Sequence, residues 1–318
     1  MSTRILQHQN DLAANSAPPL SGRVIAHFGR SVLVESLDHS LSQTCHVRAQ
    51  LEAIAAGDQV IWTPARHEQD FGVVTEVVPR FNCVERSTPQ SGQKIIASNL
   101  NQWCMVLAPV PPPSLSMLDA CLVLAEIQKI PVLIVLNKRD QAGPENDIWL
   151  QRYSSIGYEH VLTQATLGSE GIRQLQDLLA EGQCLLSGPS GVGKSSLLNA
   201  LHPDARQLTQ ILSLRSGLGQ HTTTTARLFH INTKSSIIDS PGIRSFGLDH
   251  LSTDEILRGY REITPLLGQC RFRNCRHHAE PGCALLESVH SGTIHQERFQ
   301  SFQTLLKQSY SHASYQKS

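Results

Sequence analysis

The segment Cys184–Leu201 of this 318-residue chain reads CLLSGPSGVGKSSLLNAL. Its first four residues predict a short buried strand, and the residues from Ser195 onward predict the start of a helix. The residues between them fit the pattern G-x-x-x-x-G-K-[ST], whose glycines let successive backbone N–H groups converge on phosphate oxygens at a helix N-terminus. The segment therefore predicts a phosphate-binding loop formed by Gly188, Pro189, Ser190, Gly191, Val192, Gly193, Lys194 and Ser195.

Two side chains of this loop have chemistry suited to a nucleoside triphosphate. Lys194 is expected to pair with the β- and γ-phosphates, where its charge stabilises the transition state and makes it a catalytic residue. The Ser195 hydroxyl is expected to be a ligand of Mg²⁺. A glycine-rich turn that arose by chance is the alternative, and the strand–loop–helix context disfavours it.

A second motif indicates which nucleotide binds. Asn137, Lys138, Arg139 and Asp140 form N-K-R-D directly after the apolar run 131–136, at the end of a predicted buried strand, where α/β sheets bind ligands. The Asp140 carboxylate can accept hydrogen bonds from N1–H and the 2-amino group of guanine, which adenine does not offer. Asn137 is expected to approach the O6/N7 edge, and the Lys138 stem to lie along the base. In isolation a solvated turn would look the same, but beside a phosphate loop the motif predicts GTP.

Two further stretches are expected near the γ-phosphate. Asp239 and Gly242 belong to D-S-P-G, which follows the predicted strand 236–238 and supplies the D-x-x-G expected at the γ-phosphate and the Mg²⁺ water shell. The run 217–225, GLGQHTTTT, offers hydroxyl groups for the metal, and Thr223 is the expected Mg²⁺ ligand. An ordinary polar loop is the alternative for this run.

The order of these motifs is unusual. Ordinary GTPases have the phosphate loop first, then the threonine switch, D-x-x-G and finally N-K-x-D, whereas here N-K-R-D precedes the phosphate loop. The chain therefore predicts a circular permutation of the GTPase domain. Such a permutation costs little where the original termini lie close together at the surface.

Composition narrows the class of protein. Basic and acidic residues both number 27, so the overall charge does not demand nucleic acid, and any such binding must come from local patches. No apolar run is long enough to span a bilayer, and the polar N-terminal residues lack a signal-peptide core. Several of the eight cysteines lie in apolar segments, which is typical of reduced thiols in a cytoplasmic protein.

The N-terminal part of the chain predicts a tail and a small barrel. Residues 1–19 lack periodicity and are expected to be a disordered tail. Residues 20–80 contain β-rich runs separated by turn signals, which predict an OB-type β-barrel, a frequent oligonucleotide binder. The segment is not basic, so a packing or protein-binding barrel is the alternative. The predicted strands are 23–27, 31–35, 45–48, 59–62 and 72–78.

Residues 81–247 are expected to form the permuted GTPase domain, a central α/β domain. The segment Pro79–Ala97, with Arg80 and Arg86, predicts a linker leading into it. Beyond the linker, predicted strands alternate with helices, which indicates a mainly parallel sheet with helices on both faces. The first helix is expected to be capped by Ser116 and Asp119. The strands are expected near 100–107 and 158–162, and the helices near 116–129, 145–156 and 172–179.

Residues 248–318 are expected to form a mainly helical zinc-binding domain. A capping box at Ser252–Glu255 begins one helix, and a final helix is expected over 294–308. Between them the spacing C-x4-C-x-H-x5-C can close a tetrahedral Cys₃His zinc site, which is structural because protein supplies all four ligands. The expected ligands are Cys270, Cys275, His277 and Cys283, with His278 as the competing fourth ligand. The arginines between them form either an RNA-facing edge or a solvated face.

Together these features resemble one family, the circularly permuted bacterial GTPases known as RsgA or YjeQ. The resemblance covers about residues 20–310 and rests on the ordered motifs N-K-R-D, G-P-S-G-V-G-K-S, G-L-G-Q-H-T-T-T, D-S-P-G and C-R-F-R-N-C-R-H-H-A-E-P-G-C. It implies GTP hydrolysis stimulated by the small ribosomal subunit during its late maturation. The implied partners are GTP or GDP, the small subunit and its rRNA, with no membrane. The implied cofactors are one zinc per chain and Mg²⁺ with GTP, and a cytoplasmic monomer is expected.

Two positions depart from ordinary GTPases. The loop 163–168, expected to present backbone N–H groups to guanine O6, has Gln164 and Ala165 where such GTPases usually have Ser-Ala, and Ala165 is the expected contact. Ile243 stands where Ras-like enzymes have the glutamine that orients water, and its side chain cannot hydrogen-bond the attacking water. His221 is the nearest polar candidate for that catalytic role.

The sequence therefore predicts a GTPase in which water attacks the γ-phosphate in line. An RNA-binding factor in which GTP only locks a conformation is the alternative. An ATP-using enzyme is disfavoured by N-K-R-D.

Overall fold

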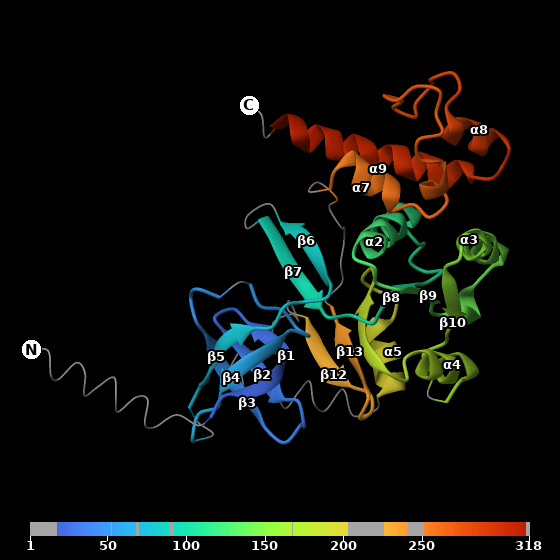
Figure 1. Cartoon of the computed structure of the whole chain (residues 1–318). Coiled ribbons are helices and arrows are strands. Elements are labelled where there is room, and N and C mark those ends of the chain that lie inside the picture. The colour runs from blue at the N-terminus through green and yellow to red at the C-terminus, as the bar shows by residue number, and fades with distance from the viewer. Residues whose placement is uncertain are drawn as a thin grey trace, which may run out of the picture.

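The computed structural model describes residues 18–51, 53–67, 70–88, 92–166, 168–202, 226–240, 248 and 251–315. Three parts follow one another along the chain: a β-barrel, a central α/β domain and a helical C-terminal part (Figure 1). Residues 1–17 of the predicted tail, the whole run 217–225 and residues 241–247 lie outside the described residues.

The barrel has the strand connections of an OB fold, and the prediction is confirmed. Its strands follow the order β1-β2-β3-β5-β4, and β4 pairs back with β1 to close the barrel. Four of its five pairings are antiparallel, while β3 and β5 are parallel. Alternate residues point inward and build a small apolar core around Trp62. The strands are β1 Leu20–Phe28, β2 Ser31–Ser36, β3 Ser42–Val47, β4 Gln59–Thr63 and β5 Gly72–Val77.

A hairpin stands where a linker was expected. Strands β6 (Cys83–Thr88) and β7 (Gly92–Ser98) pair in antiparallel fashion and form a separate sheet above the barrel (Figure 1). The linker prediction was wrong because backbone pairing between the two strands and contacts with the barrel order this segment, whose polar sequence has no regular strand periodicity.

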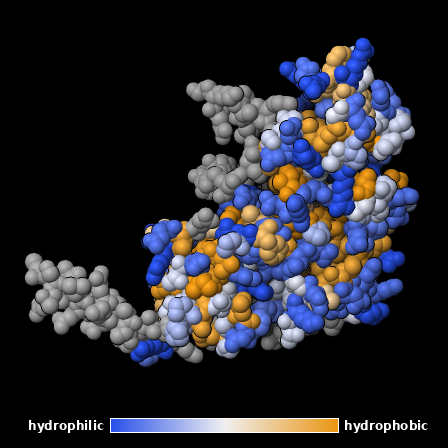
Figure 2. Space-filling model, in the orientation of Figure 1, coloured by the Kyte–Doolittle hydropathy of each residue, from blue (hydrophilic) through white to orange (hydrophobic). Residues whose placement is uncertain are grey.

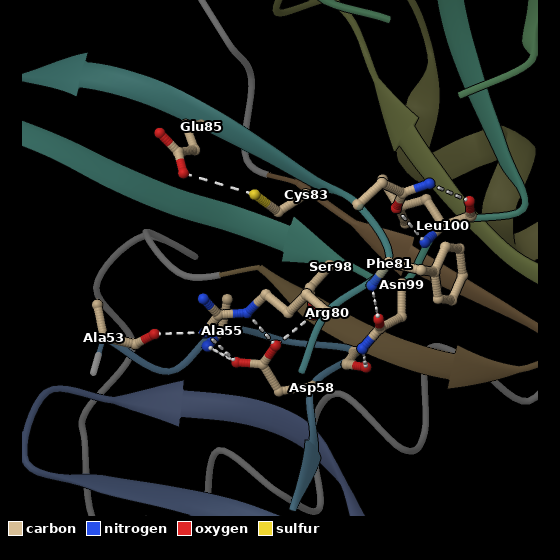
Figure 3. Close-up of polar contacts among 12 residues, drawn as sticks. Ala53, Ala55, Asp58, Arg80, Phe81, Cys83, Glu85, Ser98, Asn99 and Leu100 are labelled. Carbon is tan, nitrogen blue, oxygen red and sulfur yellow. Dashed lines mark hydrogen bonds and ion pairs between the residues drawn. The ribbon is translucent and has the colours of Figure 1, made fainter. Parts of the chain in front are cut away.

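The hairpin is tied to the barrel by the buried Asp58. This carboxylate accepts hydrogen bonds from the Ala55 N–H (2.8 Å), the Ser98 hydroxyl (2.6 Å) and both Nε and Nη2 of Arg80 (2.6 and 2.7 Å; Figure 3). Asp58 is 0% exposed. Burying a charged carboxylate is tolerable only when it is fully partnered, so this contact fixes how the hairpin leaves the barrel.

The central domain has the sheet expected of a permuted GTPase. Its strand order is β10-β9-β8-β11-β13-β12, all parallel except β12, which runs antiparallel to β13. The three strands on one side of β11 precede it in the chain, and the two on the other side follow it. The strands are β8 Gln102–Leu107, β9 Val132–Leu136, β10 Glu159–Leu162, β11 Gly182–Ser187, β12 Arg227–His230 and β13 Ser235–Asp239.

The sheet continues into the barrel, because β12 pairs with β1 through Ala26 and Arg227 and so joins eleven strands into one sheet. Helices cover both faces of the central domain, as predicted. One core cluster contains residues of α2 (Leu115–Ile127) and α3 (Pro144–Ser155), and the other contains residues of α4 (Glu170–Leu178) and α5 (Lys194–Leu201).

The cap predicted for α2 is wrong. Ser114, not Ser116, is the N-cap residue, and its hydroxyl accepts from the Met117 N–H at 3.4 Å. Asp119 instead lies buried and pairs with Arg298 of the C-terminal part, while the Tyr153 hydroxyl donates to it at 2.7 Å.

The C-terminal part packs on α2 through its helices. Its capping box is confirmed: the Ser252 hydroxyl accepts from the Glu255 N–H at 3.3 Å and the Glu255 carboxylate accepts from the Ser252 N–H at 2.8 Å. The helix Ala284–His290 was not predicted. The elements are α7 Thr253–Arg258, the 3₁₀ turn η2 Thr264–Leu266, α8 Ala284–His290 and α9 Gln296–Tyr315. Within the described residues, none of the helices has the length and apolar character needed to cross a membrane.

Candidate functional site

The phosphate loop joins β11 to α5 and packs against its neighbours without space for side chains at two glycines. Gly188 has φ 149° and Gly193 has φ 94°, both in the region that favours glycine. A Cβ at Gly188 would overlap the Val106 carbonyl oxygen of β8, and one at Gly193 would overlap the Asn137 amide nitrogen. The glycines therefore let the loop lie directly on the next strand and on the N-K-R-D motif.

Lys194 curls back over this loop. Its Nζ donates to the carbonyl oxygens of Gly188 (2.7 Å) and Pro189 (2.8 Å). Burial lowers the pKa of Lys194, and the nearby Asp239 opposes that shift. Charged phosphate oxygens are stronger acceptors than carbonyl oxygens, so a bound triphosphate can replace these two carbonyls as the acceptors of the Lys194 ammonium group. Ser195 lies in the first turn of α5 and is exposed.

Asp239 ends the strand β13 beside the loop. Leu186 of β11 is in register with it, so its carboxylate lies at the same sheet edge as the phosphate loop. Among the described residues, its buried Oδ1 has no hydrogen-bond partner. Burial raises the pKa of Asp239 to about 6, and Lys194 counteracts this. A buried acceptor without a partner costs about 1–3 kcal/mol. The residues thus fit a hydrated Mg²⁺ beside Ser195, because its water ligands would supply the missing donors.

The guanine motif is bonded directly to the phosphate loop. The buried Asn137 donates from Nδ2 to the Val192 carbonyl (3.0 Å) and accepts at Oδ1 from the Thr163 hydroxyl (3.1 Å). Lys138, at a left-handed φ of 59°, donates from Nζ to the carbonyls of Val110 (2.6 Å) and Gly191 (2.7 Å). These contacts place the two motifs in one site. Because Val192 and Thr163 already occupy the nitrogen and the oxygen of the Asn137 amide, the contact of this amide with the O6/N7 edge of guanine stays a prediction.

The rest of the motif turns toward solvent. Arg139 and Asp140 lie in the 3₁₀ turn η1 (Arg139–Gln141), and both side chains are exposed. The Arg139 N–H donates to the Thr163 carbonyl at 3.0 Å, so the loop with the half-buried Ala165 lies beside the motif. The hydrogen bond from the Thr163 hydroxyl to Asn137 was not predicted. The sequence did contain a signal for it, because Thr163 directly follows a strand that ends at the same sheet edge as the N-K-R-D motif.

Three predicted site residues cannot be placed. His221, Thr223 and Gly242 lie outside the described residues, as does Ile243. Their roles at the water and the metal therefore stay predictions.

The predicted zinc ligands come together in the C-terminal part. Cys270, Cys275, His277 and Cys283 offer ligand atoms that all lie within 4.8 Å of one another. The His277 Nδ1 is 3.6 Å from the Cys270 Sγ and 3.5 Å from the Cys283 Sγ, and the two sulfurs are 4.0 Å apart. Tetrahedral Zn²⁺ with ordinary bond lengths separates such atoms by about 3.5–3.8 Å, so the geometry fits zinc.

The backbone distinguishes the two candidate histidines. His277 has a left-handed φ of 58°, which turns its ring toward the sulfurs, whereas the side chain of His278 is exposed. Burial raises the pKa of the Cys283 thiol, and a divalent cation would supply the positive charge that favours its thiolate.

A phosphate loop on the central strand of the sheet, with a guanine motif that precedes it in the chain, defines a circularly permuted GTPase. The family described as RsgA GTPase matches residues 77–249. Two relatives are both named small ribosomal subunit biogenesis GTPase RsgA. The one from Alcanivorax borkumensis is 44% identical over 88% of this chain and 82% of its own length, and the one from Ectopseudomonas mendocina is 42% identical over 91% and 85%. The chain belongs to the RsgA GTPase family.

Solved structures agree with this fold. The crystal structure of YjeQ from Thermotoga maritima is 28% identical, with a TM-score of 0.70 over 92% of this chain and 99% of that chain. YloQ, described as a circularly permuted GTPase, is 23% identical, with a TM-score of 0.66 over 92% of this chain and 96% of that chain, and it supports the fold alone.

Proposed function

We propose that this GTPase acts in the biogenesis of the small ribosomal subunit, in the cytoplasm and as a monomer. It binds the subunit at a late stage, hydrolyses GTP to GDP and phosphate, and is stimulated by the subunit. The observation that carries the proposal is the hydrogen bonding of the guanine motif to the phosphate loop through Asn137 and Lys138. The two relatives named small ribosomal subunit biogenesis GTPase RsgA, which match this chain over most of their own length, support it.

The residues of the proposed site have distinct tasks in the reaction. Asp140 selects guanine, and the loop amides with Lys194 stabilise the charge that develops on the phosphates. Mg²⁺, held by Ser195 with Thr223, would supply further charge stabilisation. Asp239 would accept hydrogen bonds from the metal's water ligands, and Gly242 is proposed to contact the γ-phosphate. His221 is the proposed group for positioning the attacking water.

The flanking parts are proposed to bind rRNA. On the barrel, the ring of the exposed Phe71 stacks on His46 with centroids 4.4 Å apart, and hydrophobic residues reach the surface over this part of the molecule (Figure 2). An aromatic platform of this kind suits base stacking. Arg271 and Arg273 are exposed beside the proposed structural zinc, one per chain, and suit phosphate contacts. The proposed domain boundaries are 20–80, 81–247 and 248–318.

The test is single-turnover GTP hydrolysis with small subunits, with large subunits and with neither. Small subunits are expected to raise the rate at least about tenfold, which corresponds to about 1.4 kcal/mol of transition-state stabilisation. Equal rates in all three reactions would contradict the proposal. Tight binding to small subunits with no rise in rate would favour a factor in which GTP only locks a conformation.

A further inference from the structure

A second group of metal-ligating side chains lies far along the chain from the C-terminal cysteines, at the junction between the barrel and the GTPase sheet. It consists of Glu35 on β2, His39 in the turn after β2 and His230 at the end of β12. Their ligand atoms lie within 4.8 Å of one another. Neither the nucleotide site nor the C-terminal cluster uses these residues.

The three side chains converge on a single oxygen. The Glu35 Oε2 is 2.7 Å from the His39 Nδ1 and 2.6 Å from the His230 Nε2, and the two imidazole rings meet edge to face with centroids 4.5 Å apart. Burial acts to raise the pKa of Glu35, but hydrogen bonds from His230 and His39 outweigh it and leave the pKa lowered. The carboxylate is therefore ionised at neutral pH and has two nitrogen donors beside it.

The backbone holds the exposed member of this group in place. His39 has a left-handed φ of 60°, and its N–H donates to the Ser36 carbonyl at 2.9 Å. In the same turn the Asp38 carboxylate accepts from the hydroxyls of Ser36 (2.6 Å) and Ser40 (2.7 Å). The imidazole is thus presented by an ordered turn, which lowers the entropic cost of ligation.

We propose that Glu35, His39 and His230 form a second metal site, for a divalent cation of the zinc class, that clamps the barrel to the GTPase sheet. Two imidazoles and one carboxylate are a donor set that suits Zn²⁺, and they leave one coordination position for water. Their side chains are 17%, 45% and 34% exposed, so an ion can enter from solvent.

Metal binding requires only a small change of this geometry. Ligand atoms about 2.1 Å from a tetrahedral ion are separated by about 3.4 Å, so each nitrogen has to move away from the Glu35 oxygen by about 0.7 Å. To ligate the ion, each imidazole gives the proton that lies toward Glu35 to water, and a neutral ring takes up a proton from water on its other nitrogen, so that this exchange releases no net proton. The ion then replaces two N–H···O hydrogen bonds with three metal–ligand bonds.

The consequence of the site lies in where its ligands come from. His39 and Glu35 belong to the barrel, whereas His230 belongs to β12, whose neighbour β13 ends at Asp239. Between β12 and the barrel strand β1, the described backbone pairing is the one pair Ala26 and Arg227. An ion held from both sides therefore fixes the barrel relative to the sheet edge that carries the nucleotide site.

The experiment is a calorimetric titration of Zn²⁺ into the full chain after one equivalent of zinc has been retained through purification. A further equivalent is expected to bind the unchanged chain. His39→Gln and His230→Gln should each weaken it at least about tenfold, because loss of groups that only support ligands already costs 10–100-fold. His160→Gln is the control, since His160 is exposed, bonds to Ser154 and lies on the distant strand β10.

A second measurement does not depend on variants that fold. Imidazole NMR of the histidine-labelled chain should show the His39 and His230 ring signals shifting with the added zinc while the His160 signal stays. Failure of the chain to bind zinc beyond the first equivalent would overturn the proposal. So would binding that both His→Gln variants retain in full. Neither outcome bears on GTP hydrolysis with ribosomal subunits, so the two proposals fail independently.

Discussion

Buried carboxylates at the domain junctions have hydrogen-bond partners, whereas the buried carboxylate at the nucleotide site has an oxygen without a partner among the described residues. At the junctions, Asp58 and Asp119 are 0% and 2% exposed, and each is paired with an arginine and with hydroxyl donors. At the nucleotide site, Asp239 has a buried oxygen without a partner among the described residues. A satisfied buried charge fixes a junction, whereas an unsatisfied one indicates where a ligand completes the structure.

The two junctions also differ from each other. Arg298 is 2% exposed, pairs with both Asp119 and Glu262, and lies over the ring of Tyr260 at 4.4 Å. Burial alone would lower the pKa of Arg298, but the two carboxylates raise it well above its ordinary value. Arg80 retains 14% exposure of its side chain, so water reaches the junction of the barrel. The C-terminal junction is therefore expected to be the more sensitive to loss of its arginine.

Replacement of Arg298 should have the largest effect. Arg298→Met leaves Asp119 and Glu262 in the interior without their cation, and the expected loss of unfolding free energy is about 3–5 kcal/mol. Urea unfolding of the variant and the unchanged chain measures it. Lys234→Met is the matched control, because Lys234 and Glu181 form an exposed pair, with an expected change of about 0–1 kcal/mol. Equal losses in the two variants would break the comparison.

Replacement of Asp58 should have an intermediate effect. Asp58→Asn keeps one acceptor for Ser98 or Ala55 but removes the charge opposite Arg80. Because the Arg80 side chain is 14% exposed, water can solvate its guanidinium and recover part of the lost stability. The expected cost is about 2–3 kcal/mol by the same measurement. Asp70→Asn, in an exposed turn of the same barrel, should leave stability unchanged. A loss of stability as large as that of Arg298→Met would show that the greater exposure of Arg80 does not reduce the cost of removing its carboxylate partner.

Replacement of Asp239 should have the smallest effect and the opposite sign. Its pKa in the folded chain, about 6, lies above the ordinary value of 3.8, so the folded state favours the protonated form. Its contribution to stability is therefore lost as pH rises from about 4 to about 6. Without nucleotide, Asp239→Asn should stabilise the chain by about 1–2 kcal/mol at pH 7.5 and have little effect at pH 4.

The check is urea unfolding at both pH values without nucleotide or Mg²⁺, with the exposed Asp177→Asn as control. The same variant should hydrolyse GTP more slowly, because its carboxamide is a poorer acceptor for metal-bound water. If Asp239→Asn destabilised the chain at pH 7.5, Asp239 would have to be grouped with Asp58 and Asp119.

The sequence predicted well those features that depend on neighbours in the chain. The phosphate loop, the barrel strands and the Ser252 capping box follow from local patterns, because periodicity and motif chemistry act over a few residues. The motif order was sufficient to predict the permuted sheet. His277 could not be separated from His278 by spacing, because the choice depends on a left-handed backbone angle at His277.

The errors concern partners that are distant in the chain. Asp119 looked like a capping residue because a serine stood three positions before it, yet its partner Arg298 is 179 residues away. The hairpin β6–β7 looked like a linker because the tie that orders it, from Asp58 to Arg80 and Ser98, joins three separate segments. Such pairs are decided by packing, which local patterns do not contain.

The pairing of β1 with β12 has a consequence for synthesis of the chain. Ala26 leaves the ribosome about 200 residues before Arg227, which at 5–20 residues per second is a delay of about 10–40 s. During that interval this edge of β1 has no strand beside it, and an open strand edge invites pairing with other nascent chains. The early closure of β1 against β2 and β4 allows the barrel to fold first and protects the rest of the strand. The barrel can therefore fold during synthesis before β12 is available to pair with it and join it to the GTPase sheet.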